Sequence, residues 1–171
     1  MDNNIRFIVL GDLIADLYYY GSKLIGIDGG SSRFNVIANL ANMNCNTVAI
    51  GGCGSDKFGK TVLKRYSKLG VDVSRVKFRD RPIRAYNLSI DQAMLPKLSY
   101  ECSKISPVTY QNTWYEDSLE ELEYYKSQVN PNDVIVLDKL DTFSLDIIDN
   151  VECHKVLDIG HSNRLEKLND E

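Results

Sequence analysis

Short apolar runs alternate with amphipathic stretches along most of this chain, and the two patterns have different periods. Ile5 to Leu10 (IRFIVL) is a continuous apolar run ending at Gly11, as expected of a buried strand. Five further segments are strand-like: Thr47 to Ile50, Val71 to Phe78, Arg81 to Asp91, Val134 to Leu137 and Lys155 to Ile159. The tyrosine-rich, glycine-bounded piece between Leu17 and Ile27 predicts a short two-stranded excursion.

Apolar positions with helical spacing predict four helices between these strands. After Gly30, the side chains Phe34, Ile37, Ala38 and Ala41 recur with helical spacing. Ser31 or Ser32 is expected to cap this helix, and Asn44 to end it in a left-handed conformation. The other predicted helices are Thr61 to Leu69, stopped by Gly70, then Asp117 to Gln128, and Phe143 to Asp149.

Strands that alternate with helices indicate an α/β fold with a mostly parallel sheet and helices on both faces. Residues 1–171 are expected to form a single domain, since this length is ordinary for one hydrophobic core. The stretch Gln92 to Tyr115 has no clean period and is read either as more excursion strands or as an irregular insertion. Residues 163–171 are polar and tail-like.

Composition narrows the classes of function. The sequence is 43% hydrophobic and 26% charged, as in a globular protein. A net charge of −4 and the lack of a basic patch argue against a nucleic-acid partner, and no apolar run is long enough to span a membrane. Cys45, Cys53, Cys102 and Cys153 form no C-x-x-C pair and, with His154 and His161, no metal-ligand spacing, so we expect reduced thiols in a cytoplasmic protein without a metal site.

The stretch from Gly29 to Val76 carries most of the candidate chemistry. It is read as glycine turn, helix, strand, glycine loop, helix and strand. Backbone amides exposed at such glycines are natural sites for polar or anionic ligands, and in parallel sheets ligands bind beyond the carboxyl ends of the strands. Asp16, the Gly29–Gly30 pair, the 51–59 loop and Asp138 are all expected at such ends, although Asp16 taken alone is equally compatible with a solvated turn.

One interpretation of the glycine-rich 51–59 loop is a phosphate loop. Gly54 to Thr61 (GSDKFGKT) matches G-x-x-x-x-G-K-[ST] between a strand and a helix, and Asp138 would then end an acidic strand that helps to hold magnesium. Against this, Asp56 would place an acid inside the cradle and oppose the bound charge. The reading also leaves Asp16 and the Gly29–Gly30 pair unexplained.

The whole pattern resembles the ribokinase-like (PfkB) carbohydrate kinases. Between Ile5 and Asp91 the motifs of that family occur in the same order: GDLIADLYYYG, then GG followed by Asn35, then GGCGSDKFG, then LGVDVSRV. The resemblance implies a three-layer α/β core with a small β lid, whose strands lie near 17–27 and 83–91. It also implies that Asp16, Gly29, Gly30 and Asn35 bind the sugar. The residues Ser32, Arg33 and Phe34 depart from the family pattern, where small residues are usual.

The resemblance further implies phosphoryl transfer from ATP, with Mg²⁺, to a hydroxyl of a sugar or sugar phosphate, and a homodimer formed through the lid sheet. The family's catalytic aspartate belongs to a G-A-G-D motif, and no G-x-G-D occurs here. We therefore expect the fold to be truncated on its C-terminal side, with no catalytic residue and no ATP site in this chain. Three accounts stay open: a fragment of a sugar kinase that is inactive alone, a non-catalytic sugar-binding or dimerisation module, and a phosphate-loop NTPase that uses Gly54–Thr61.

Overall fold

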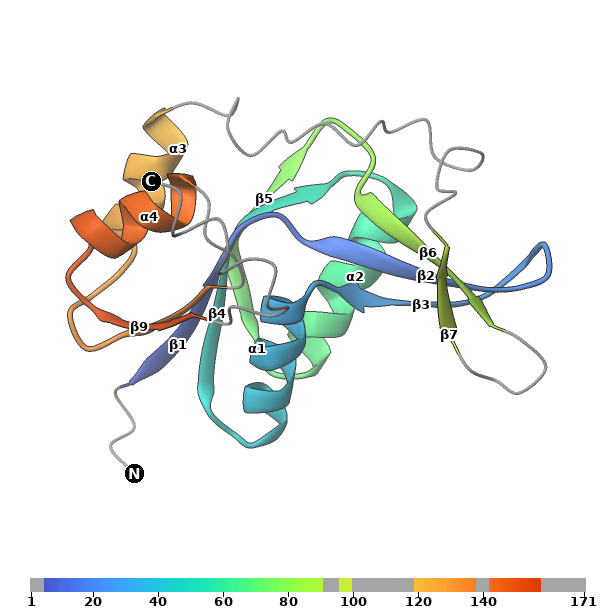
Figure 1. The fold of residues 1–171 in the computed structure, drawn as a ribbon, viewed down its shortest axis with the longest axis horizontal. Coiled ribbons are helices and arrows are strands. Elements are labelled where there is room, and N and C mark those ends of the chain that lie inside the picture. Colours follow the sequence, from blue (N-terminus) through green and yellow to red (C-terminus); the bar gives the residue numbers. More distant parts are fainter. Residues whose placement is uncertain (1–4, 91–95, 100–118, 138–141, 158–171) are drawn as a thin grey trace, which may run out of the picture.

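The computed structural model describes residues 5–90, 96–99, 119–137 and 142–157. The first part of the chain forms β1 (Arg6–Leu10), β2 (Ile14–Tyr20), β3 (Lys23–Gly30), α1 (Ser32–Asn42), β4 (Asn46–Gly54), α2 (Lys57–Lys68), β5 (Asp72–Arg79) and β6 (Arg84–Ile90). The remainder forms β7 (Pro96–Ser99), α3 (Leu119–Ser127), β8 (Val134–Leu137), α4 (Thr142–Asn150) and β9 (His154–Leu157). These elements build two sheets and two layers of helices (Figure 1).

The central sheet has five strands in the order β5-β4-β1-β8-β9, and every neighbouring pair is parallel. Its middle strands are buried on both faces, which explains why they are continuous apolar runs in the sequence. The side chains alternate between two cores. Val9, Ala49 and Val136 belong to one cluster, whereas Ile8, Val48 and Ile135 belong to the other.

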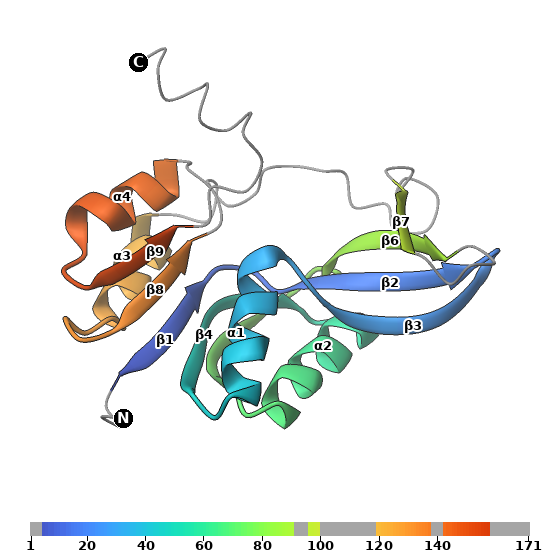
Figure 2. The same cartoon turned by 60° about the horizontal axis from the view of Figure 1, so that its bottom comes forward.

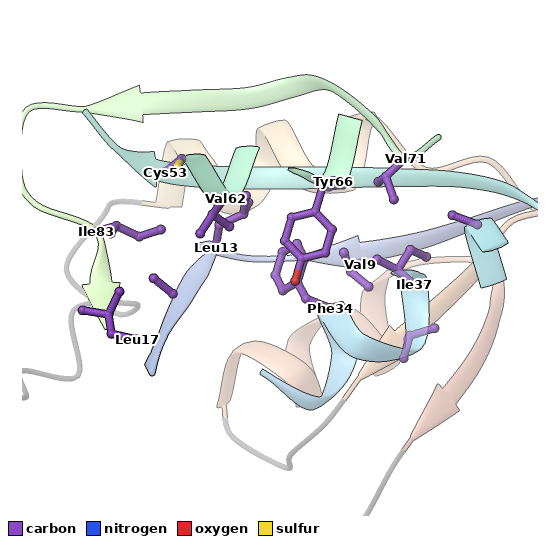
Figure 3. Packing of buried hydrophobic residues seen from close by; sticks show 14 of the residues in the cluster. Val9, Leu13, Leu17, Phe34, Ile37, Cys53, Val62, Tyr66, Val71 and Ile83 are labelled. Atoms are coloured by element: carbon purple, nitrogen blue, oxygen red, sulfur yellow. The ribbon is translucent and has the colours of Figure 1, made fainter. Parts of the chain in front are cut away.

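Helices cover both faces of this sheet and make the core three-layered. Phe34 and Ile37 of α1 and Val62 and Tyr66 of α2 pack on the first face, as Figure 3 shows. Tyr125 of α3 and the Ile147 side chain of α4 pack on the opposite face with the second cluster. Figure 2 shows the two helix pairs on opposite sides of the strands. The prediction of a three-layer α/β fold with a mostly parallel sheet is therefore confirmed.

The second sheet has four strands in the order β3-β2-β6-β7 and extends to one side of the core (Figures 1 and 2). It is mixed: β2 is antiparallel to β3 and parallel to β6, and β7 is antiparallel to β6. α2 packs against β2 and β3 from one side. The predicted excursion strands are thus present, with β7 as a further strand within the stretch that lacked a clean period.

Several predicted boundaries near glycine were wrong. Gly29 and Gly30 are not a turn but the last two residues of β3, paired with Ala15 and Ile14. Strand β4 continues to Gly54. Its last glycines are closely approached by neighbouring atoms, which leave no room for a Cβ at Gly51, Gly52 or Gly54. Ser31 stands at the start of α1, but its side chain makes no capping hydrogen bond. Asn44 is left-handed (φ 61°), as expected, and Gly70, which follows α2, has φ 93°.

Candidate functional site

The candidate site lies where the second sheet meets the central core. Strand β1 ends at Leu10 and the chain then enters β2, while β3 returns to the core and leads directly into α1. Ser31, between Gly30 and α1, has φ 80° and ψ 139°, a region that non-glycine residues rarely occupy. Such backbone conformations cost free energy and often mark ligand sites. At this junction Gly29 and Gly30 pair with Ala15 and Ile14, and the Asp16 carboxylate lies against Gly30.

Asp16 projects from the middle of β2 and lies against Gly30. A Cβ added at Gly30 would collide with the Asp16 carboxylate, so only glycine at this position leaves room for it. Neighbouring Ala15 and Leu17 are buried in the core on the opposite side of the strand. Strand alternation therefore turns Asp16 away from that core. The expectation that Asp16 follows the carboxyl end of a strand was wrong, because the residue lies within a strand.

Four polar side chains share this outward side of the second sheet. Asp16 pairs in register with Asp28 on β3 and with Tyr86 on β6, and Arg84 lies two residues before Tyr86. Residues in register on adjacent strands project from the same side of a sheet. We call the side that carries Asp16, Asp28, Arg84 and Tyr86 the polar face.

Burial and charge act together on Asp16. Burial raises the pKa of the Asp16 carboxyl above its usual value, and the nearby Asp28 carboxylate raises the same pKa further. A carboxylate in this setting has lost much of its hydration, so it gains from hydrogen-bond donors supplied by a ligand. Perturbed carboxyl groups of this kind often lie at functional sites.

Asp28 is held in place at the edge of the polar face. Its Oδ1 accepts a hydrogen bond from the Gly29 amide at 2.7 Å and forms an ion pair with Arg65 of α2. Sequence reasoning did not single out Asp28. The signal in the sequence was an acidic residue directly before the glycine pair. The register that places it beside Asp16 is known only from the structure.

Gly29 contributes on the opposite side, towards the core. A Cβ at Gly29 would collide with the Tyr66 hydroxyl, and the Tyr66 ring packs on Phe34 with centroids 5.4 Å apart. Figure 3 shows these two rings side by side. The Tyr66 hydroxyl is buried and has no hydrogen-bond partner among the described residues. Burial, with the nearby carboxylates Asp28 and Asp16, raises the pKa of this phenol.

Asn35 lies on the helix that follows this group. It lies in the first turn of α1, where its side chain is exposed and its amide donates a helical hydrogen bond to the Ser31 carbonyl at 3.0 Å. The structure joins Asp16 to Gly30 by direct packing. Asn35 follows five residues after Gly30 in the chain.

The 51–59 segment has the wrong geometry for a phosphate loop. Gly54 belongs to β4, and α2 already begins at Lys57. The Asp56 carboxylate caps α2 by accepting a hydrogen bond from the Gly59 amide at 2.9 Å, so an acid occupies the place where a phosphate would bind. The thiol of Cys53 donates to the Gly59 carbonyl at 3.3 Å, and burial raises the pKa of this thiol to about 12. The proposed magnesium partner, Asp138, lies outside the described residues.

A second charged group lies at the ends of β1 and β5. Asp12 forms ion pairs with Arg79 (3.1 Å) and Arg81 (2.9 Å), and Gly52 leaves room for Asp12 and Arg79 to meet. Arg79 also donates to the Tyr125 hydroxyl at 3.4 Å. These contacts join β1, β5 and α3, which indicates a structural role. Sequence reasoning missed them because the partners are 67 and 69 residues apart.

Two classes of site are absent from the described part of the chain. No group of three or more His, Cys, Asp or Glu side chains could hold a metal ion there. None of its helices combines the length and the apolar character that crossing a membrane requires.

Comparison with solved structures identifies the fold. The chain aligns with a PfkB family carbohydrate kinase from Listeria grayi (TM-score 0.63, 16% identity, covering 96% of this chain and 55% of that one). It aligns with Arabidopsis thaliana ribokinase complexed with ribose and ATP (TM-score 0.64, 18% identity, 92% and 54%). A third match is Vibrio cholerae fructokinase bound to fructose, ADP and calcium (TM-score 0.57, 16% identity, 91% and 50%).

Sequence comparison alone does not reach these proteins. No family model matches the chain, and no curated protein matches it at a significant level. The chain spans about half the length of the solved structures it matches. At these identities the likeness concerns the fold, and the chain has the ribokinase-like fold of the PfkB sugar kinases.

Proposed function

We propose that this chain binds the hydroxyl groups of a sugar or sugar phosphate through Asp16, as the acceptor-binding part of a carbohydrate kinase. The observation that carries the proposal is the Asp16 carboxylate, partly desolvated and lying against Gly30 at the junction of the two sheets. The ribokinase-like fold supports it, because solved proteins of that fold include a ribokinase with ribose and a fructokinase with fructose.

The chemistry of the junction suits a sugar. An ionised carboxylate accepts hydrogen bonds from two vicinal hydroxyls, and these bonds replace the hydration that Asp16 has lost. Gly30 has no side chain, so the Asp16 carboxylate can lie directly against its backbone at the junction. Asn35, exposed on the first turn of α1, would complete the site from the helix side, since its amide both donates and accepts.

Phosphoryl transfer would require parts that this chain does not supply. The chain matches about half of the sugar-kinase structures and has no G-x-G-D sequence. We therefore propose that the complete enzyme uses ATP and Mg²⁺, and that this chain alone binds acceptor without turnover. The small sheet would then act as a lid that excludes water from the transferred group. A non-catalytic sugar-binding module, dimeric through that sheet and located in the cytoplasm, is the alternative.

Calorimetric titration of the full chain with ribose, fructose and their phosphates tests the proposal. Asp16→Asn should weaken sugar binding roughly tenfold to a hundredfold, as expected for loss of hydrogen bonds to a charged group. Asp72→Asn is the matched control, since Asp72 is an exposed acid on β5 and should not affect binding. A parallel titration with ATP compares wild type with Lys60→Ala.

The outcomes separate the functions. Sugar binding that is lost in Asp16→Asn and kept in Asp72→Asn and Lys60→Ala supports the proposal. Binding of ATP that vanishes in Lys60→Ala, with no sugar bound, would replace it by the phosphate-loop function. Turnover of ATP with any sugar by this chain alone would refute the statement that it lacks the catalytic machinery.

A further inference from the structure

Tyr18 lies two residues after Asp16 on β2, and the proposed function has not used it. Leu17 and Tyr19, on either side of it, are buried in the core cluster to which α2 contributes. Strand alternation therefore places Tyr18 on the polar face with Asp16, on the side of β2 away from α2 (Figure 2). Residues two apart in a strand are separated by about 6–7 Å. A sugar ring bound at Asp16 would therefore reach Tyr18.

No side chain lies opposite the Tyr18 ring on β3. Its partner in register is Gly26, and a Cβ added at Gly26 would lie 3.6 Å from the Tyr18 ring. The ring thus lies over bare backbone, and Tyr18 stays partly exposed. Among the described residues it has no stacking, cation or side-chain hydrogen-bond partner. This ring is therefore available to a ligand.

The other tyrosines of the polar face are less suited to a ligand at Asp16. An Arg84 guanidinium nitrogen donates to the Tyr86 hydroxyl at 3.4 Å, and the guanidinium carbon lies 5.8 Å from the centre of the Tyr86 ring. Tyr20 is 49% exposed, but it lies four residues from Asp16. Four residues of strand span about 13 Å, which is too far for one monosaccharide. Tyr18 is the tyrosine that is both open and within reach.

The chemistry of Tyr18 complements that of Asp16. A sugar in its ring form carries hydroxyl groups around its edge and C–H groups on its faces, and tyrosine combines an apolar body with a polar tip. Burial raises the pKa of the Tyr18 phenol, and the Asp16 and Asp28 carboxylates raise it further against the opposing charge of Arg65. The hydroxyl therefore stays protonated and can donate a hydrogen bond. An open-chain polyol has similar hydroxyls but no flat C–H face.

We infer that Tyr18 is a stacking platform for the C–H face of the acceptor, and that the site selects a closed-ring sugar over an open-chain polyol. The inference rests on the proposed function and narrows its substrate class. Asp16 accepts hydrogen bonds from hydroxyls at one edge of the sugar, and the Tyr18 ring covers the adjoining face.

Calorimetric titration of the full chain with two matched pairs of probes tests this: ribose with ribitol, and fructose with mannitol. A closed sugar is also less flexible than its polyol, so the comparison between variants, and not the preference alone, measures stacking. Tyr18→Leu should weaken binding of the sugar roughly tenfold, because it removes the apolar contact with the ring, and should affect the polyol much less. Tyr18→Phe should bind like wild type. Tyr20→Leu, the same kind of change further along β2, is the matched control.

The outcomes distinguish each failure. Equal sugar binding by wild type and Tyr18→Leu overturns the inference, and leaves the proposed function intact if Asp16→Asn still weakens binding. Equal weakening of sugar and polyol by Tyr18→Leu also overturns it, because general damage to the site affects both. No binding of any probe overturns the inference and the proposed function together. If Tyr18→Leu does not fold, nuclear Overhauser effects between C–H protons of the bound sugar and the wild-type Tyr18 ring decide: their presence supports the platform, and their absence overturns it.

Discussion

Asp16 on β2 and Asp28 on β3 are neighbours in register, but the two carboxyl groups lie in different environments. Asp28 accepts a hydrogen bond from the Gly29 amide and forms an ion pair with Arg65 at the sheet edge. Asp16 lies further inside, against Gly30, where burial and the Asp28 charge raise its pKa. The folded state without ligand therefore carries a cost for ionising Asp16, and a bound hydroxyl donor offsets that cost.

This cost should appear as a pH-dependent stability difference between wild type and Asp16→Asn. The pKa of Asp16 in the folded chain is raised above 3.8, so the folded state binds this proton more tightly than the unfolded state. Wild-type stability from this group therefore falls as pH rises through 3.8 towards the raised pKa. We expect Asp16→Asn to gain stability relative to wild type over that window and to hold the gain at neutral pH, measured by thermal unfolding at a series of pH values.

Asp72→Asn provides a control of opposite sign. Partial burial opposes the shift, but hydrogen bonds from Ser74 and the charges of Arg75 and Arg6 lower the pKa of Asp72. Its stabilising contribution is present above 3.8 and is lost as pH falls through the lowered pKa, so Asp72→Asn should lose stability relative to wild type as pH rises. A pH-independent difference for Asp16→Asn, or one with the sign of Asp72→Asn, would show that Asp16 is not held in a desolvated site.

At the scale of elements, glycines decide how the two sheets join. Gly51 approaches the Gly11 carbonyl, and Gly54 approaches the backbone of Ile83 at the start of the chain into β6. The Leu13 amide donates to the Gly52 carbonyl at 2.8 Å, so pairing with β4 continues past the end of β1. The glycine-rich segment is therefore a strand that lets other backbones approach, and not an open loop.

Gly54→Ala should accordingly be much more damaging than Gly26→Ala, although both residues lie in strands. A Cβ at Gly54 would collide with the backbone nitrogen of Ile83, which cannot move away as a flexible side chain can. We expect Gly54→Ala to lower the free energy of unfolding by about 1–3 kcal/mol or more, measured by urea denaturation. At Gly26 the new Cβ would lie 3.6 Å from the Tyr18 side chain, an ordinary contact.

Gly26→Ala should therefore be neutral or stabilise the chain by up to about 0.5–1 kcal/mol, because alanine loses less backbone entropy on folding. Similar effects of the two substitutions would contradict the close approach of β4 to the segment before β6. Equal slopes of the free energy against urea concentration are needed for the comparison, since a changed slope would indicate an altered unfolded state.

Helices and strands that show a clear hydrophobic pattern were predicted well from the sequence. Segments that contain glycine pairs were predicted poorly. Val134–Leu137 was predicted with the right bounds, and the helix faces of Phe34, Ile37 and Ala41 are buried as expected. Gly29–Gly30 and Gly51–Gly54 were assigned to turns or loops. Glycine favours turns in isolation, but here tertiary contacts with Tyr66, Asp16 and backbone require it within strands. Asp28 and Tyr86 are neighbours of Asp16 because of the register between the strands. Strand register cannot be read from a local sequence pattern.

At the scale of the whole molecule, the order of motifs was more informative than any single one. The literal phosphate-loop match at Gly54–Thr61 is a strand end and a helix capped by Asp56. The spaced set of Asp16, the glycine pair and the later glycines instead agrees with the ribokinase-like fold. A short motif occurs by chance more easily than a series of residues that must meet at one junction, as Asp16 and Gly30 do.

The described sheet ends in β9, and this edge should make the isolated chain self-associate. Val156 in the middle of β9 is 53% exposed, and an edge strand offers unpaired backbone groups to another strand. We expect wild type to dimerise or form larger species as concentration rises in sedimentation velocity. Val156→Lys should weaken this association by about 1 kcal/mol, roughly fivefold in dissociation constant, because a charged side chain disfavours edge pairing.

Val36→Lys makes the same change on helix α1, where Val36 is 38% exposed, and should leave association unchanged because it does not alter a strand. Equal weakening by both variants would indicate that net charge, and not the β9 edge, governs association. A wild-type chain that stays monomeric at every concentration would mean that the β9 edge does not pair, and the second sheet would then have to be tested separately for the dimer that the ribokinase-like resemblance implies.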